Sequence, residues 1–323
     1  MKLDVGSNLW MTMTVSAKVL EADGIYSFKF RVASGEALPR FTAGSHIDVE
    51  VAPNLIRQYS LCNVAGQESE YEIAVLLTEP SRGGSRGMHA IEVGQSIRIS
   101  APRNNFNLVP STGRSILVAG GVGITPILSM AEELHAQSRA FELHFSARSP
   151  TRAAFRQRLA ERSFAKDVRF YFDNEGQKLD LADIARSRQP DDHLYVCGPT
   201  GFMDFVLGES ERLGWKKEQL HKEYFSPPSV EEKSGASFDV KIASTGDVFH
   251  IPEDKSVVQV LAENGIEIPT SCEQGICGTC ITRVLSGSID HRDFILSDEE
   301  KRRMDQFTPC CSRAACQVIE LDL

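Results

Sequence analysis

The sequence lacks any long uninterrupted hydrophobic run. Its longest apolar stretch, "SILVAGGVGITPILSM" (115–130), contains three glycines and one proline. It is also shorter than the roughly 20 residues that a membrane-spanning helix needs. The first residues, "MKLDVGSNLWMTMTV", lack an apolar core and a small-residue cleavage site, so no signal peptide is predicted. We therefore expect a cytoplasmic protein with no membrane partner.

The sequence also lacks the excess of positive charge that nucleic-acid binding requires. Its formal net charge at pH 7 is −9, and residues 226–323 alone contain 17 Asp and Glu against 9 Lys and Arg. We therefore expect no nucleic-acid partner. The acidic C-terminal part is predicted to meet a basic protein surface, since its field would speed the encounter. The alternative is that this charge only keeps the protein soluble.

The composition is that of an ordinary globular protein, with 41% hydrophobic and 24% charged residues. Residues 12 to about 105 contain short alternating strands separated by turn residues, a pattern typical of a small antiparallel barrel. From residue 114 to 225, apolar strands alternate with helical segments, which predicts a doubly wound parallel sheet. The predicted boundaries are 1–108 and 109–226 for these two domains, 227–236 for a linker, and 237–323 for a small C-terminal domain.

Six of the eight cysteines lie in the last 52 residues. Three share one glycine-dotted loop and a fourth follows after 29 residues: Cys272, Cys277, Cys280 and Cys310. The pattern C-x4-C-x2-C…C is the spacing of plant-type [2Fe–2S] ferredoxins. Gly275 and Gly278 would let the backbone curl so that N–H groups point at sulfur. Zinc sites more often use two C-x2-C pairs, and a reducing cytosol disfavours disulfides, so we expect an iron–sulfur site.

Two stretches of the predicted barrel contain residues suited to a flat, phosphate-bearing ligand. In "RQYSLC", Arg57 could hold a phosphate, Tyr59 could pack on a ring, and Ser60 could hydrogen-bond to it. "SRGGSRGMH" (81–89) is a glycine-rich turn before a helix start, whose N–H groups could cradle a phosphate together with Arg82 or Arg86. Taken singly, the first stretch is usually just a strand, and the second is more often a plain surface turn.

Two strand-end loops stand out in the predicted α/β domain. "AGGVGITPIL" (119–128) is not G-x-G-x-x-G, but its place between a strand and a helix suits a pyrophosphate. "YVCGPTGFM" (195–203) would place Cys197 and Gly198 beside a ligand at the carboxyl edge of the sheet. Taken alone, Cys197 would more often be a packed core thiol.

Arg-x-Tyr-Ser, a phosphate turn, GGxGxTP, CGP and the cysteine loop occur in this order along the chain. This order resembles the phthalate dioxygenase reductase family, the reductases of Rieske oxygenases, over essentially the full length. The resemblance implies a monomer with three domains. The predicted fold class is a multidomain chain with an antiparallel β-barrel domain for FMN, an α/β doubly wound domain for NADH, and an α+β (β-grasp) plant-type ferredoxin domain for a [2Fe–2S] cluster.

The resemblance also implies site residues, motif by motif. Those implied for FMN are Arg57, Tyr59, Ser60, Ala74, Val75, Arg82, Gly83, Gly84, Ser85, Thr125 and Phe225. Those implied for NADH are Gly120, Gly121, Gly123, Cys197, Gly198 and Asp173, whereas Arg148 and Arg152 could instead favour NADPH. In "PCCSRA" the first cysteine, Cys310, would be the fourth cluster ligand, with Cys311 and Cys316 as the alternatives.

The implied function is electron transfer from NADH through FMN and [2Fe–2S] to a Rieske-type terminal oxygenase, which docks at the acidic ferredoxin domain. NADH releases two electrons together whereas the cluster carries one, and a flavin can exchange electrons either way. No general acid or base is needed, so none is predicted. One rival is a reductase for a diiron or P450 monooxygenase, against which the C-terminal position of the ferredoxin argues. Another is a flavin and iron–sulfur redox sensor, for which no DNA-reading motif is found.

Overall fold

The computed structural model describes residues 10–32, 35–53, 55–66, 69–227 and 235–323. Most of the predicted linker 227–236 lies outside these residues. The chain divides into two units, Met1–Phe225 and Ser226–Leu323, and each is described by itself. Within the described residues, no helix has the length and apolar character needed to cross a membrane.

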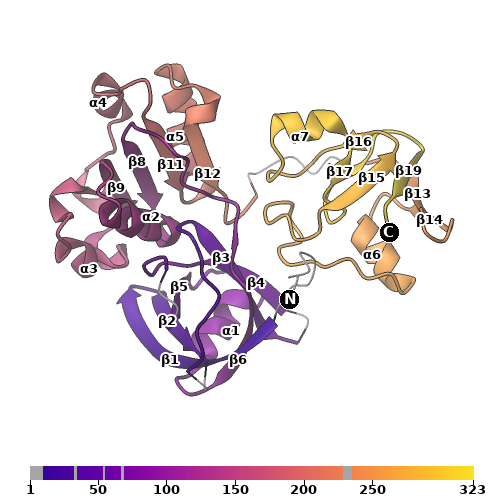
Figure 1. Ribbon diagram of the computed structural model, residues 1–323, viewed down its shortest axis with the longest axis horizontal. Helices are drawn as coiled ribbons and strands as arrows, with labels where there is room; N and C mark the ends of the chain where they lie inside the picture. The colour runs from indigo at the N-terminus through magenta and orange to yellow at the C-terminus, as the bar shows by residue number, and fades with distance from the viewer. Residues whose placement is uncertain (1–9, 33–34, 54, 67–68, 228–234) are drawn as a thin grey trace. The chain divides into compact units, whose positions relative to one another are not determined.

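The first part of unit 1 is an antiparallel barrel (Figure 1). Its elements are β1 (Trp10–Ala22), β2 (Ile25–Arg31), β3 (Ser45–Ala52), β4 (Leu55–Ser60), β5 (Tyr71–Leu76), α1 (Gly84–Ala90), β6 (Ser96–Ser100) and β7 (Arg103–Asn104). The strands pair in the order β4-β3-β6-β1-β2-β5, with β7 on β3, and a bridge between Leu61 and Ile73 joins the two ends. Alternate residues such as Phe28, Phe30 and Ile47 face inward and form its core, because successive side chains of a strand point to opposite faces.

The second part of unit 1 is a parallel sheet with helices on both faces (Figure 1). Its strands are β8 (Ser115–Gly120), β9 (Phe141–Ala147), β10 (Val168–Phe172), β11 (His193–Cys197) and β12 (Leu220–Glu223), in the order β10-β9-β8-β11-β12. Its α-helices are α2 (Ile124–Ala136), α3 (Arg156–Ala160), α4 (Leu181–Arg186) and α5 (Thr200–Arg212). Its 3-10 turns are η1 (Gly121–Gly123), η2 (Pro150–Arg152), η3 (Ala165–Asp167), η4 (Asp173–Glu175) and η5 (Lys217–Gln219). One hydrophobic core holds residues of α2 and α3, and another holds residues of α4 and α5, so helices cover both faces.

Polar contacts fix the barrel against the parallel sheet. Arg158 of α3 makes a 2.8 Å ion pair with Glu72 of β5, whose carboxylate is buried. The Ser129 hydroxyl of α2 donates to the Asn63 carbonyl, just after β4. Because these groups are enclosed by both parts, the barrel and the sheet form one continuous body, which agrees with their assignment to a single unit.

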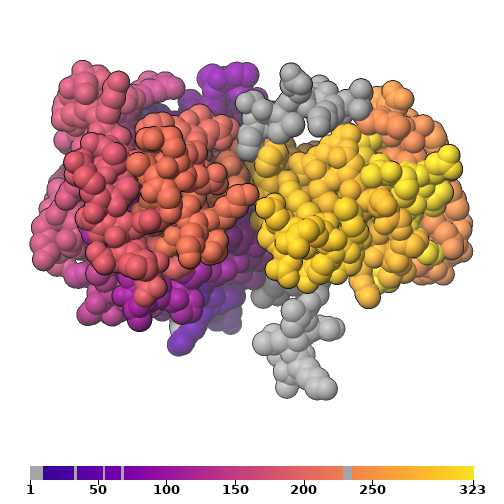
Figure 2. Space-filling model, turned by 90° about the horizontal axis from the view of Figure 1, so that it is seen from above, coloured from indigo at the N-terminus to yellow at the C-terminus, as the bar shows by residue number. Residues whose placement is uncertain are grey.

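The second unit is a small mixed sheet with two short helices. Its elements are β13 (Phe238–Ile242), β14 (Val248–Ile251), α6 (Val257–Glu263), β15 (Thr282–Ser286), β16 (Ile289–Asp290), α7 (Asp298–Arg303), β17 (Gln306–Phe307), β18 (Arg313–Ala314) and β19 (Val318–Leu321). The strand order is β14-β13-β19-β15-β17, with β13 and β19 parallel, while β16 pairs with β18. Side chains of α6 pack into the core of this sheet. In the space-filling view of Figure 2, the later residues of this unit, in yellow, form most of its visible face.

The predicted fold class is confirmed: a barrel, a doubly wound sheet and a β-grasp domain follow one another along the chain. The boundaries predicted at residue 108 and around 227–236 stay predictions.

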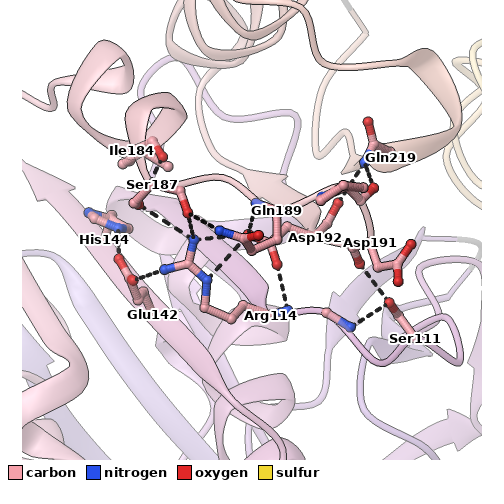
Figure 3. Close-up of polar contacts among 12 residues, drawn as sticks. Ser111, Arg114, Glu142, His144, Ile184, Ser187, Gln189, Asp191, Asp192 and Gln219 are labelled. Carbon is pink, nitrogen blue, oxygen red and sulfur yellow. Dashed lines mark hydrogen bonds and ion pairs between the residues drawn. The ribbon is translucent and has the colours of Figure 1, made fainter.

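Arg114 organises the amino ends of the parallel strands (Figure 3). Its Nη2 lies 2.9 Å from the buried carboxylate of Asp192, and its Nη1 lies 2.6 Å from Glu142. Burial alone would raise the pKa of Asp192, but hydrogen bonds from the Gln189 N–H and from Arg114 hold it below its usual value. The network therefore ties β8 and β9 to the loop before β11, at the end of the sheet opposite the glycine loops.

We expect Arg114→Met to lower the free energy of unfolding of unit 1 by about 3 kcal/mol, because it leaves a buried carboxylate without its partner. Urea unfolding followed by tryptophan fluorescence measures this, since both tryptophans, Trp10 and Trp215, lie in unit 1. Arg186→Met is the control, because its ion pair with Asp183 is exposed and should contribute less than about 1 kcal/mol. Equal losses for the two variants would contradict the prediction.

Candidate functional site

Two loops meet at the carboxyl edge of the parallel sheet. The η1 loop follows β8, and the CGP loop follows β11, its neighbour in the sheet. A Cβ on Gly123 would overlap the carbonyl oxygen of Cys197, and a Cβ on Gly120 would lie 2.7 Å from the ring of Phe202. Glycine is needed at both positions because the backbones approach so closely. The loops therefore bring together the predicted NADH residues Gly120, Gly121, Gly123, Cys197 and Gly198.

Asp173, the remaining residue predicted for NADH, begins η4 directly after β10. It is exposed and lies at the same edge of the sheet, but β9 separates its strand from β8. This distance along the edge suits the far end of an extended dinucleotide more than its centre.

The barrel reaches this edge through Ser60 at the end of β4. The Ser60 hydroxyl donates to the Glu223 carboxylate at 2.9 Å, and Glu223 ends β12. In the register of β11 and β12, Glu223 is the partner of Cys197. Burial raises the pKa of the Glu223 carboxyl to about 7, and burial together with the Glu223 charge raises that of the Cys197 thiol. The structure thus gathers a hydroxyl, a carboxyl and a thiol where the barrel meets the sheet.

The residues predicted to hold a phosphate lie together on the barrel. The Arg57 guanidinium donates to the Arg82 carbonyl at 3.2 Å, and a Cβ on Gly84 would lie 2.6 Å from the Arg57 side chain. Gly83 has a φ of 90°, which glycine adopts without strain. The Ser85 hydroxyl lies 3.1 Å from the hydroxyls of Thr78 and Ser81. Arginine beside a glycine turn is the arrangement that a flavin phosphate requires, so these residues fit FMN.

The other residues predicted for FMN lie in different surroundings. Ala74 shares a hydrophobic core with Ala119 and Cys197, so β5 packs against the carboxyl edge of the sheet. The Val75 side chain instead points into the barrel core, and its carbonyl faces His89. The Tyr59 side chain packs against the barrel core, and burial raises the pKa of its hydroxyl. Thr125 is buried at the start of α2, where its hydroxyl donates to the Val122 carbonyl, whereas Phe225 is 37% exposed and offers a ring surface.

The cysteine loop of the second unit curls as its glycines require. Gly275 and Gly278 have φ values of 71° and 74°. The Gln274 N–H donates to Cys272 Sγ at 3.3 Å, and the Thr279 N–H donates to Cys277 Sγ at 3.4 Å. Backbone donors therefore point at sulfur, as a thiolate-bound cluster requires.

The thiols of the loop and of the distant cysteine form two pairs. A hydrogen bond from Cys272 lowers the pKa of Cys277 to about 6, and the same contact raises the pKa of Cys272. The Cys310 thiol contacts Cys280, which raises the pKa of Cys310 to about 12, and it also contacts the Cys311 thiol, which acts in the opposite direction. The described residues contain no group of three or more ligating side chains around a single metal position. Four thiols from two segments fit a [2Fe–2S] cluster, which takes four cysteine thiolates.

A strand pair brings the distant cysteine to the loop. β15 begins two residues after Cys280, β17 ends three residues before Cys310, and Thr282 pairs with Phe307 across the two strands. The other two candidates have different surroundings. Cys311 Sγ lies 3.3 Å from the Thr308 hydroxyl and borders Gly275 of the cysteine loop, whereas Cys316 Sγ accepts from the Ser288 N–H at 3.2 Å.

Sequence reasoning did not find Glu223 as a site residue. The motif "EYF" contains it, but only the terminal Phe225 was carried over from the resemblance. A single glutamate at the end of a strand gives no signal by itself. Its place becomes apparent only once the barrel strand β4 and the sheet strand β12 are seen to meet.

Two family models match the chain. The model described as "2Fe-2S iron-sulfur cluster binding domain" matches residues 240–319, and "Oxidoreductase NAD-binding domain" matches residues 117–207. The first spans all four cysteines predicted as cluster ligands, and the second spans both glycine loops.

Full-length relatives agree with these two domains. The chain is 52% identical to a vanillate O-demethylase oxidoreductase of Pseudomonas sp. (strain HR199 / DSM 7063), over 96% of this chain and 98% of that protein. It is 35% identical to the phthalate dioxygenase reductase of Burkholderia cepacia, over 97% of this chain and 98% of that protein.

Solved structures give the same result. A structure of phthalate dioxygenase reductase, described as transferring electrons from pyridine nucleotides to [2Fe–2S], matches with 35% identity and a TM-score of 0.73, over 97% of this chain and 98% of that chain. An intact type IV self-sufficient cytochrome P450 monooxygenase matches with 36% identity and a TM-score of 0.89, and this chain spans 43% of it. The chain therefore belongs to the phthalate dioxygenase reductase family, and it is an NADH-dependent flavin iron–sulfur oxidoreductase that transfers electrons through FMN to a [2Fe–2S] cluster.

Proposed function

We propose that this chain reduces a Rieske-type terminal oxygenase, with electrons entering where barrel and sheet meet in unit 1 and leaving through the cysteine loop of unit 2. The observation that carries the proposal is that the β15–β17 strand pair brings the Cys310 segment to the cysteine loop, in a unit with its own core. Four thiols from two segments suit a one-electron carrier. The contact between barrel and sheet around Ser60 suits a hydride acceptor next to a nucleotide site.

In the proposed flavin site, each residue group has one task. Arg57 and the turn 82–85 bind the FMN phosphate, and Tyr59, Ser60 and the β5 backbone at 74–75 orient the ring. Phe225 covers the ring with its exposed face, and Thr125 lies near the nicotinamide contact. FMN, when bound, accepts two electrons from NADH and releases them singly.

In the proposed nucleotide site, the η1 and CGP loops receive NADH at the carboxyl edge of the sheet, and Asp173 lies toward the adenosine end. Glu223 adds a function that the sequence motifs did not indicate. With a pKa of about 7, its carboxyl can hold or release a proton at neutral pH beside the Ser60 hydroxyl.

The proposed partner follows from the relatives. Three relatives with 52%, 50% and 44% identity are named vanillate O-demethylase oxidoreductases, so the proposed oxygenase acts on a methoxylated aromatic acid of this type. Glu267 and Glu273 are exposed in and before the cysteine loop, and Ile281 directly after it is 37% exposed. An apolar spot with acidic neighbours suits brief docking to a basic surface.

A cytochrome P450 partner is the second candidate, because two P450 chains contain a region similar to this whole chain. In both matches this chain is a minor part of a longer protein, at 43% and 42% of its length. The position of the ferredoxin at the C-terminal end therefore does not argue against a P450 partner as strongly as the sequence reasoning assumed.

We predict that Cys310→Ala abolishes the [2Fe–2S] signal, whereas Cys311→Ala retains it. Cys310 is the thiol that contacts Cys280, while Cys311 contacts Cys310, Thr308 and Ser312. Electron paramagnetic resonance of the dithionite-reduced proteins measures the signal, and flavin content controls for folding. Cys316→Ala is a further control that should resemble the wild type. Loss of the signal in Cys311→Ala with retention in Cys310→Ala would assign the fourth ligand to Cys311.

We predict that Glu223→Gln changes the pH dependence of stability of the flavin-free protein. The free energy of unfolding of the variant, relative to that of the wild type, should be higher at pH 8 than at pH 5. The folded pKa of about 7 lies above the ordinary value of 4.5, so the wild type loses stability through this range while the Gln variant does not. The relative change should be about 1–3 kcal/mol, allowing for partial exposure of Glu223. Urea unfolding at both pH values measures it, with exposed Glu218→Gln as the control. A difference between Glu223→Gln and wild type that is the same at pH 5 and pH 8 would refute it.

We predict that raising the ionic strength slows reduction of the oxygenase more than it slows reduction of the flavin by NADH. Salt screens the attraction between the acidic ferredoxin surface and its partner. Glu273→Asn should slow reduction of the oxygenase about threefold at low salt, because it removes one negative charge. Asn is chosen because it tolerates the positive φ of 55° at this position. Asp247→Asn, in the turn between β13 and β14, is the control.

Stopped-flow measurement with a purified vanillate-type oxygenase and, separately, with a P450 distinguishes the two candidate partners. Equal slowing of both steps by salt would argue against electrostatic docking. Rapid reduction of the P450 alone would favour the second candidate.

A further inference from the structure

A short segment between β16 and α7 links the two parts of the chain that carry the cysteine thiols. The Phe294 N–H donates to the carbonyl of Gly275, in the cysteine loop, at 2.9 Å. The Arg292 N–H donates to the Ser312 hydroxyl, two residues after Cys310, at 3.1 Å. Residues 292–294 therefore contact both segments, so a substitution in them can alter the surroundings of the thiols in either segment.

Asp293, at the centre of this segment, is a buried charge. Its side chain has 0% exposure, and its Oδ2 accepts the Leu296 N–H at 2.9 Å. Lys301 of α7 donates to the Asp293 carbonyl at 2.5 Å, and its Nζ lies 3.6 Å from Oδ2. His291 Nδ1 lies 3.2 Å from Oδ1. One carboxylate thus has a cation and an imidazole as neighbours.

This charge lies directly behind the cysteine loop. A Cβ on Gly275 would lie 2.5 Å from Cys311 Sγ on one side, and 3.0 Å from Asp293 Cα and 3.3 Å from Asp293 Cβ. The Gly275 backbone, in turn, hydrogen-bonds to the Cys310 thiol. Asp293 therefore packs against Gly275, whose backbone donates to a predicted cluster sulfur. Hydrogen bonds to the sulfur atoms help to set the reduction potential of a cluster.

Stability alone gives a weak reason for such a pair. Taking a carboxylate and an ammonium out of water costs several kcal/mol, and an apolar pair of the same volume is often as stable. The position behind Gly275 gives a stronger reason. One-electron reduction adds one negative charge to a cluster, so a nearby carboxylate opposes reduction and a nearby ammonium favours it.

We propose that Asp293 and Lys301 set the reduction potential of the [2Fe–2S] cluster in opposite directions, with Asp293 as a positioning residue that acts through Gly275 and through its charge. The carboxylate keeps the potential low, which favours passing the electron onward, and the ammonium limits this effect. The inference rests on the proposed binding of the cluster by Cys272, Cys277, Cys280 and Cys310.

The test is a potentiometric titration of the purified holoprotein at pH 8, monitored by electron paramagnetic resonance and requiring no oxygenase. Asp293→Asn should make the potential more positive, and Lys301→Met should make it more negative. Each change should alter the one-electron equilibrium about tenfold, which is about 59 mV. Lys301→Arg keeps the charge and should restore the wild-type potential.

A charge-matched control separates this local effect from the general charge of the domain. Asp305→Asn removes one negative charge from the same domain, and the Asp305 side chain is 54% exposed. Its effect on the potential should be small, because water and salt screen it. A purely structural role for the pair would loosen the loop in both variants and move both potentials in the same direction.

Shifts of the same sign in Asp293→Asn and Lys301→Met, or shifts no larger than that of Asp305→Asn, would overturn the proposal. If Asp293→Asn assembles no cluster, the comparison of Lys301→Met with Lys301→Arg tests the proposal. These two variants should fold, because Lys301 is partly exposed and both replacements retain a long unbranched side chain. Absence of a [2Fe–2S] signal in the wild-type protein would instead refute the proposed function, and the two failures are therefore distinguishable.

Discussion

Two irons require four thiolates in two pairs, and the second unit is built around that requirement. The loop 272–280 supplies three thiols within nine residues, and the antiparallel pairing of β15 with β17 returns the chain so that Cys310 meets Cys280. Gly275 and Gly278 have positive φ values, and the neighbouring Gln274 and Thr279 N–H groups donate to cysteine sulfur. The site geometry therefore follows from a strand register and two glycines, and the metal is not needed to explain how the thiols meet.

The first unit has a different task, which is to place the flavin ring and the nicotinamide ring in contact. The parallel sheet presents its glycine loops at one edge, and the barrel meets that edge through Ser60 and Ala74. The ion pair of Arg158 with Glu72 and the buried contact of Ser129 with Asn63 hold the two parts together. The contact between barrel and sheet is thus the proposed place of electron entry, and the proposed exit lies in a separate unit.

The sequence was sufficient for features that are local in the chain. The cysteine spacing, the glycine loops and the alternating barrel strands each depend on neighbouring residues, and the fold class and cofactor classes could be predicted from them. The approach of the segment that holds Cys310 and Cys311 to the cysteine loop was not local, because it depends on the register of β15 and β17. Glu223 and Asp293 were missed for the same reason: each gains its meaning from a residue distant in sequence, Ser60 and Gly275 respectively.

Electron transfer by this chain requires that it hold both a flavin and a cluster of two irons on paired thiols. The most direct measurement is the metal, acid-labile sulfide and flavin content of the purified protein, with metals determined by mass spectrometry and the flavin identified after acid extraction. We expect two irons, two sulfides and one FMN for each chain. One zinc for each chain, or iron without labile sulfide, would contradict it.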